Sequence, residues 1–306
     1  MTTGGRQLRT LVVAVVLMVI AGFVPAFVMG LVGWADGVNV GFLAGTALLI
    51  ACLGGTGWRT GLVISLPFAL FAGLANWAAA NPWLAAIVLA GAALVRGYAA
   101  KAGMHDALTM AVIALGFIVT SPVSVAGSLP VTSAAYVALL CLACGLWATL
   151  VIFLLRRRLH VHQHTGLDPI RVVTYSLTLA GLVGVATWFV IDLGLGHTGG
   201  WIILTILVVF QPSLGAGFKK AAARAAGTVL GIASLLFVAF LTPGIVLLDS
   251  AGSTVQLVAE QRLGATLIGV LGTVVVMLAL APLSTRLFSE RTPTRQSLSE
   301  RPSRQV

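Results

Sequence analysis

The sequence predicts an all-α, polytopic membrane protein with about ten transmembrane helices. Hydrophobic residues make up 59% of the 306 positions and charged residues only 8%, far below the roughly 25% charge of soluble domains. Apolar stretches of about 20 residues, the length that spans a bilayer, recur along the chain. The Lys and Arg residues lie mainly in the short segments between these stretches.

Ten spans are expected from these apolar stretches, at residues 11–32, 38–54, 60–79, 83–101, 106–121, 131–155, 172–193, 200–211, 222–241 and 263–284. If the N-terminus is cytoplasmic, every Lys and Arg except Arg262 falls on or near the cytoplasmic side. Cytoplasmic loops of membrane proteins carry such an excess of positive charge. The net charge of +10 therefore indicates orientation in a lipid bilayer and not binding to nucleic acid, and both termini are predicted to be cytoplasmic.

The polar segment 156–171 divides the chain into a first transmembrane half, 1–155, with six spans and a second half, 172–285, with four. Because six is even, both halves enter the membrane in the same direction, which predicts a parallel repeat. Two similar tripeptides, Gly57-Trp58-Arg59 and Gly217-Phe218-Lys219, support it. Short, Gly-interrupted hydrophobic segments at matching places in two halves indicate a transporter's binding site. The basic tail, 286–306, is nearly free of apolar residues and is predicted to be disordered.

The stretch "FQPSLGAGFKKAAARAAGTVLGI", residues 210–232, joins the eighth and ninth expected spans. Pro212 is expected to end one helix and to begin the next. Lys219, Lys220 and Arg224 then lie near a helix N-terminus, which itself favours anions. These cations either only set the orientation of the chain or bind a negatively charged solute. In the second case, nearby Gln211 and Ser213 would act as hydrogen-bond donors.

Two further cations come from the first half of the chain. Arg59 follows the second span, and Arg96 lies about one turn from the cytoplasmic end of the fourth. The side chain of Arg96 is expected either to extend to the membrane interface or to line a transport path. Both arginines are candidate contributors to an anion site.

Small residues on the last two expected spans are assigned to helix packing. Gly227 and Gly231 have the spacing of a face that packs closely against another helix. Gly264, on the tenth span, is a weaker candidate for the same role.

No cofactor, metal site or enzymatic activity is predicted. Cys141 and Cys144 lie in an apolar span without polar neighbours, so we expect them to pack inside the protein. The histidines of the His160-Val-His162-Gln-His164 segment are assigned to a solvated loop, because further metal ligands are lacking. No phosphate-binding loop and no catalytic group of residues lies in the chain.

The segment from Trp201 to Gly231 resembles the fusaric acid resistance (FUSC) family, also called aromatic acid exporters. It contains a tryptophan-led short span, Gln211-Pro212-Ser213, Lys219 and Lys220, and "RAAGTVLG" from Arg224. The segment "RLGATLIG", from Arg262, is similar to a second element of the family. The resemblance implies a multi-pass protein of the bacterial inner membrane that exports carboxylate-bearing, often aromatic compounds.

The resulting hypothesis is the export of small organic anions. An inside-negative potential favours exit of an anion by about 2.3 kcal/mol per charge per 100 mV. A non-transporting scaffold or a partner subunit of a larger assembly is the alternative, because the chain between Gly231 and Arg262 is too short for the further spans that family members commonly carry. A homo-oligomer is one assembly that the sequence allows.

Overall fold

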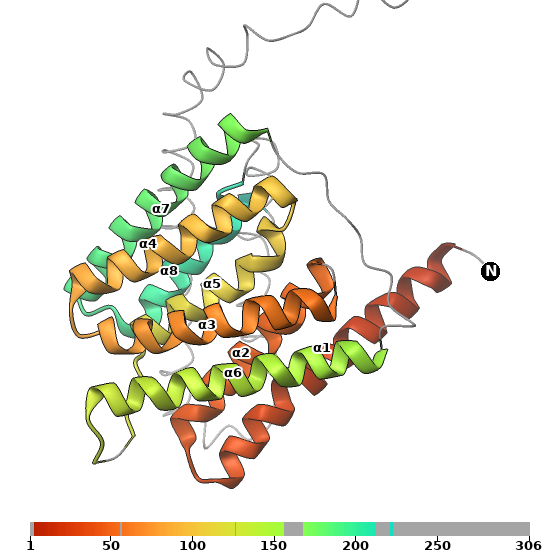
Figure 1. Ribbon diagram of the computed structural model, residues 1–306, viewed down its shortest axis with the longest axis horizontal. Helices are drawn as coiled ribbons and strands as arrows, with labels where there is room; N and C mark the ends of the chain where they lie inside the picture. The colour runs from red at the N-terminus through yellow and green to blue at the C-terminus, as the bar shows by residue number, and fades with distance from the viewer. Residues whose placement is uncertain (1–2, 56, 126, 156–167, 212–220, 223–306) are drawn as a thin grey trace, which may run out of the picture.

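The computed structural model describes residues 3–55, 57–125, 127–155, 168–211 and 221–222 of the chain. Within these residues the chain forms a bundle of eight α-helices and one short 3-10 helix (Figure 1). The helices are α1 (Thr3–Leu31), α2 (Ala35–Gly54), α3 (Trp58–Ala78), α4 (Pro82–Tyr98), α5 (His105–Thr120), α6 (Pro130–Leu155), α7 (Pro169–Asp192) and α8 (Gly196–Val209), and the 3-10 helix η1 (Ala99–Ala102) continues α4.

Each of the first eight predicted spans corresponds to one of these helices, so the all-α prediction is confirmed for this part of the chain. The ninth and tenth spans lie outside the described residues, as do most of the linker and the tail. The ten-span count, the parallel repeat and the cytoplasmic termini therefore stay predictions.

Proline residues set the beginning of three helices slightly before the predicted apolar spans. Pro82 is in the first turn of α4, after Asn81, whose side-chain oxygen accepts hydrogen bonds from two following backbone amides at 3.0 and 3.2 Å. Pro130 and Pro169 likewise begin α6 and α7. Proline fits a first helical turn because the backbone N–H that it lacks has no partner there. Hydropathy locates the apolar part of each helix, whereas these prolines locate its start.

Among the described residues, five helices are long and apolar enough to cross a membrane: α2, α3, α4 with η1, α6 and α7. The apolar helices α5 and α8 are shorter, with 16 and 14 residues. At 1.5 Å per residue they measure about 24 and 21 Å, less than the roughly 30 Å of a hydrocarbon core. Their ends must therefore be accommodated inside the protein.

The core of the bundle is centred on α5. Every residue from Ala111 to Thr120 is buried, and the helix contacts α2, α3, α4, α7 and α8. The short helix α8 packs directly against it. The two shortest α-helices of the described residues are thus next to each other in the interior.

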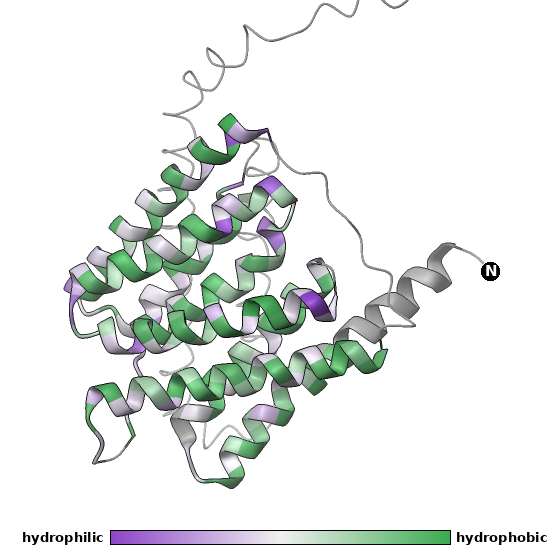
Figure 2. Ribbon diagram, viewed as in Figure 1, coloured by the Kyte–Doolittle hydropathy of each residue, from purple (hydrophilic) through white to green (hydrophobic). Residues whose placement is uncertain are grey.

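The outer surface of the bundle is apolar along the length of the helices, and hydrophilic residues concentrate near helix ends (Figure 2). Large aliphatic side chains are exposed on several helices, for example Val63 (73%), Ile87 (66%) and Leu154 (70%). A soluble protein rarely exposes apolar patches of this extent, whereas lipid covers them at no penalty. The chain is a multi-pass membrane protein.

The cations of the described loops lie on one side of the bundle. Arg59 is in the first turn of α3, Lys101 is in η1 after α4, and Arg171 is in the first turn of α7. The beginning of α3, the end of α4 and the beginning of α7 lie at the same side in Figure 1. This arrangement agrees with the charge asymmetry of the sequence.

Most buried hydroxyl groups of the described helices are satisfied within their own helices. Eight buried Ser and Thr residues donate to the backbone carbonyl four residues earlier: Thr46, Ser65, Thr109, Thr120, Thr149, Ser176, Thr187 and Thr205. Such bonds let polar side chains face an apolar interior without unpaired donors.

Helices α1 and α2 approach closely at a carbonyl group that proline leaves without its usual partner. Pro25 has no N–H, so it cannot donate to the carbonyl of Ala21 four residues earlier. Gly45 of α2 lies against that carbonyl, and a Cβ atom at position 45 would overlap its oxygen. Glycine at position 45 is therefore required for the contact between these helices.

Gly45→Ala is expected to lower the stability of the protein in detergent, because the overlap involves backbone atoms that cannot rotate away. Overpacking of this kind costs about 1–3 kcal/mol. Thermal unfolding followed by circular dichroism measures the effect. Gly30→Ala is the matched control, since a Cβ at position 30 would meet only Val38 at 3.9 Å. Equal melting temperatures for the two variants would contradict this account.

Candidate functional site

The C-terminal end of α8 lies inside the bundle, and side chains of other helices bind its carbonyl groups. The last carbonyls of a helix have no partner within it. The backbone N–H of Phe210 still donates to Ile206 O at 2.9 Å. The next carbonyl, that of Leu207, accepts a hydrogen bond from Nη2 of Arg96 on α4 at 3.1 Å. A side chain far away in the sequence thus replaces the missing helical donor.

Two further side chains complete this end of α8. Nε2 of Gln211 donates to the carbonyl of Val208 at 2.9 Å. The hydroxyl of Tyr175, on α7, donates to the carbonyl of Phe210 at 3.3 Å. The rings of Tyr175 and Phe210 are also stacked, 5.5 Å apart and 3° from parallel. Side chains of α4 and α7, together with the side chain of Gln211, therefore hold the turn before Pro212 in place.

Arg96 is a fully buried cation, with 0% of its surface exposed. Its Nε donates to Oγ1 of Thr109 on α5 at 2.8 Å, and its guanidinium lies 6.0 Å from the ring centre of Tyr175. The third nitrogen, Nη1, is buried and has no hydrogen-bond partner among the described residues. We call Arg96, Thr109, Tyr175 and the α8 end from Leu207 to Gln211 the Arg96 cluster.

Thr109 fixes the orientation of the guanidinium. Its hydroxyl donates to the carbonyl of His105 at 2.9 Å, so its oxygen lone pairs are directed toward Nε of Arg96. His105 in turn contacts Tyr175, with the two rings 6.3 Å apart and nearly perpendicular. The chain from His105 through Thr109 leaves Arg96 little freedom to rotate.

The charge of Arg96 has no carboxylate partner among the described residues. The ion pair in that part of the chain is between Asp106 and His105, with Oδ2 and Nε2 3.8 Å apart, and the side chain of Asp106 is 48% exposed. The C-terminus of α8 carries about half a negative charge, which compensates Arg96 in part. Within the part of the chain that the structure describes, a positive charge therefore remains at the junction of four helices.

Close packing of α4 on α7 places Arg96 at this junction. Gly97 lies against Ser176, and a Cβ at position 97 would come within 2.6 Å of the Cα of Ser176. The absence of a side chain at Gly97 lets the two helices approach, which directs the neighbouring Arg96 toward α5 and α8.

The predicted site residues are only partly brought together. Arg96 and Gln211 both belong to the Arg96 cluster, and Arg96 is buried instead of extending to the interface. Arg59 is exposed, and its guanidinium lies 5.7 Å from the ring centre of Trp58. Because Trp58 packs on Phe153 of α6, Arg59 lies at the contact between α3 and α6 and away from the cluster.

Other predicted residues lie outside the described residues, and their roles stay predictions. They are Ser213, Lys219, Lys220, Arg224, Gly227, Gly231 and Gly264.

Sequence reasoning missed Thr109, Tyr175 and the carbonyl of Leu207. Tyr175 is one of only three tyrosines in the chain and lies within an apolar span, which could have marked it. Thr109 is one hydroxyl among many in the apolar spans. The carbonyl of Leu207 carries no side-chain signal at all.

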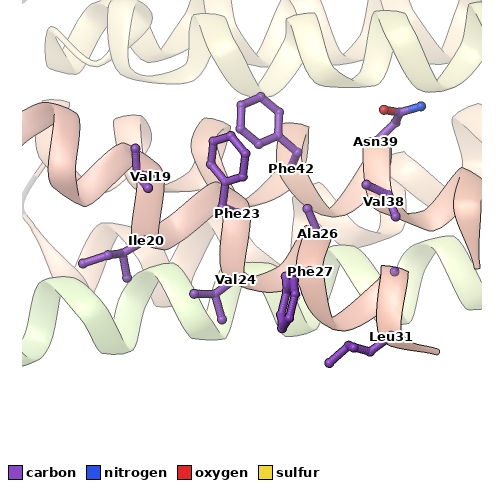
Figure 3. A pocket seen from close by; sticks show the side chains of 11 residues that line it. Val19, Ile20, Phe23, Val24, Ala26, Phe27, Leu31, Val38, Asn39 and Phe42 are labelled. Carbon is purple, nitrogen blue, oxygen red and sulfur yellow. The ribbon is translucent and has the colours of Figure 1, made fainter. Parts of the chain in front are cut away.

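A groove that lies away from the Arg96 cluster does not resemble an anion site. It has a volume of about 800 Å³ and lies on α1 and α2, lined mainly by aliphatic and phenylalanine side chains (Figure 3). Phe23 and Phe42 face each other there, 5.2 Å apart. Asn39 is the one polar side chain among the lining residues. With no cation in its lining, the groove offers nothing to a carboxylate.

Comparison with known proteins gives one match. Residues 179–295 match the family described as fusaric acid resistance protein-like. This part of the chain is similar to that family, as the resemblance implied. The match indicates a membrane transport protein. No curated protein and no solved structure matches the chain.

The matched segment includes the end of α8 but neither Arg96 nor Thr109. Leu207 and Gln211 fall within residues 179–295, whereas Arg96, Thr109 and Tyr175 precede them. The Arg96 cluster therefore connects the fusaric acid resistance protein-like segment to the first half of the chain.

Thr109→Val is expected to destabilise the protein more than Thr187→Val. Both threonines are buried and donate to the carbonyl four residues earlier, but Thr109 also accepts from Arg96. Leaving a buried charged donor without its acceptor costs about 1–3 kcal/mol. Thermal unfolding in detergent measures the difference, and equal losses in the two variants would show that the Arg96 contact contributes nothing.

Proposed function

We propose that this protein exports small organic anions, aromatic carboxylates among them, across the inner membrane of a bacterium. The export is driven at least in part by the membrane potential. The similarity of residues 179–295 to the fusaric acid resistance protein-like family supports transport. The buried, incompletely paired guanidinium of Arg96 is the observation that supports an anionic substrate.

The interactions of Arg96 within the described residues leave Nη1 without a hydrogen-bond acceptor. An unpaired buried donor costs about 1–3 kcal/mol. A carboxylate at Nη1 would supply both the missing hydrogen bond and the missing charge.

The position of Arg96 suits a site along a transport path. Residues 82–102 form one continuous apolar span, and Arg96 lies six residues from its end, about 9 Å along the helix axis. Ionisable residues at such a depth usually mark a substrate or ion path. In this proposal the anion passes from the cytoplasmic side to Arg96.

The basic segment that follows Gln211 would collect the anion first. Lys219, Lys220 and Arg224 are close in sequence to the end of α8, and Ser213 and Gln211 would donate hydrogen bonds. Arg59 would add to the positive field at the same side of the membrane. Because an inside-negative potential expels anions by about 2.3 kcal/mol per charge per 100 mV, no proton relay is required.

Flux measurements in proteoliposomes test the proposal. Purified protein is reconstituted into vesicles loaded with radiolabelled benzoate, and a potassium gradient with valinomycin sets the potential. An inside-negative potential is expected to accelerate efflux, and reversing the potential is expected to slow it. Arg96→Gln keeps an amide donor near Oγ1 of Thr109 but removes the charge and Nη1, so efflux should fall at least about tenfold.

Lys219→Ala and Arg224→Ala should lower the flux at low benzoate concentration more than at saturation, because they act in capture. Thr187→Val, whose hydroxyl bonds only within α7, is the matched control and should transport like the unmodified protein. Wild-type flux in a folded Arg96→Gln protein would overturn the assignment of Arg96. Absence of flux for every anion in a broad panel would instead favour a scaffold or partner-subunit role.

A further inference from the structure

Aromatic contacts fix the ring of Tyr175 within the Arg96 cluster. The side chain is buried, with 6% of its surface exposed. Its ring is stacked on Phe210, lies edge-on to the ring of His105, and has the guanidinium of Arg96 6.0 Å from its centre. Because these contacts involve only the ring, the ring keeps its place whatever the hydroxyl group binds.

The hydroxyl group of Tyr175 makes a long hydrogen bond. It donates to the carbonyl of Phe210 at 3.3 Å, whereas O–H···O bonds in proteins are usually about 2.7–2.8 Å long. The hydroxyl carries a single hydrogen, which rotates toward the acceptor that suits it. A stronger acceptor nearby would therefore displace the carbonyl of Phe210.

The other neutral polar side chains of the cluster are bound more tightly. The hydroxyl of Thr109 donates its only hydrogen to a backbone carbonyl at 2.9 Å and accepts from Arg96 at 2.8 Å. Nε2 of Gln211 donates to a backbone carbonyl at 2.9 Å. Among these side chains, the hydroxyl of Tyr175 is the donor that exchanges its acceptor most readily.

The hydroxyl of Tyr175 and the guanidinium of Arg96 lie at the same end of α8. The hydroxyl binds the carbonyl of Phe210, and Nη2 of Arg96 binds that of Leu207, three residues earlier. The charge of Arg96 is close enough to act on the hydroxyl. A carboxylate has about four lone-pair sites, so a single donor at Nη1 leaves most of them unused in a dry interior. A second donor beside the guanidinium would stabilise a bound carboxylate.

We propose that Tyr175 is a second ligand of the transported anion: its hydroxyl turns from the carbonyl of Phe210 and donates to the carboxylate that binds Nη1 of Arg96. This inference rests on the proposed function, because it assigns a further contact at the same site. A hydrogen bond to a charged oxygen is about twice as strong as a neutral one, so the exchange of acceptors favours binding. It also releases the carbonyl of Phe210, so an occupied site holds the end of α8 less firmly.

Isothermal titration calorimetry of the purified protein in detergent, with benzoate as the ligand, tests this contact. Tyr175→Phe keeps the ring and its stacking but removes the donor, so benzoate should bind roughly tenfold more weakly. Tyr136→Phe is the matched control, since Tyr136 of α6 is 49% exposed, and it should bind benzoate as the unmodified protein does. Thermal unfolding followed by circular dichroism checks that both variants are folded.

Infrared difference spectroscopy supplies a readout that a merely structural role of Tyr175 would not change. The C–O stretching band of a tyrosine shifts when its hydroxyl donates to a new acceptor, and the chain has three tyrosines. Benzoate should shift one tyrosine band in the unmodified protein and in Tyr136→Phe, and none in Tyr175→Phe.

Equal affinities of Tyr175→Phe and the unmodified protein for benzoate would overturn the proposal and leave anion export standing. The absence of a shifted tyrosine band when the unmodified protein binds benzoate would do the same. Failure of the unmodified protein to bind benzoate would overturn both this contact and the anion site of the proposed function.

Discussion

The hydrogen bond from Arg96 to the carbonyl of Leu207 is the interaction on which the interior of this protein depends. A backbone carbonyl at the end of a helix that stops inside an apolar bundle has no water to bind. Helix α8 is too short to carry its end to the aqueous surface, so a donor must come from elsewhere in the chain. Arg96 supplies it from α4, and its burial creates the positive site inside the protein.

The same requirement is met at the end of the other short helix, α5. There the side chain of Asn76, on α3, both donates to the carbonyl of Val123 at 3.1 Å and accepts from its N–H at 2.8 Å. The amide of Asn76 is neutral and fully matched to one backbone residue. The comparison explains why the α8 end, unlike the α5 end, is electrically unbalanced. Arg96 has three nitrogens, and after it binds the carbonyl of Leu207 and the hydroxyl of Thr109, Nη1 is left without a partner among the described residues.

Helix positions could be predicted from the sequence because long apolar runs leave few alternatives in a membrane. The break before Pro212 was also predictable, since proline excludes helical continuation of the preceding residue. The environment of Arg96 could not be predicted from the sequence. A position one turn from a helix end allows both an interfacial and a buried side chain, and the choice is made by Gly97, which admits α7 so closely. The partners of Arg96 include a backbone carbonyl, which no sequence pattern reveals. The basic residues after Gln211 stay a prediction, based on their order along the chain and their likeness to the fusaric acid resistance protein-like family.

The central claim is that the free nitrogen of Arg96 receives the carboxylate of a transported anion. A crystal structure of the protein with 4-bromobenzoate tests it most directly, because bromine can be located by anomalous scattering. The account predicts a carboxylate within hydrogen-bond distance of Nη1, with the bromine near the Arg96 cluster. A structure in which Nη1 is paired with a carboxylate of the protein itself, and in which no bromine lies near Arg96, would contradict it.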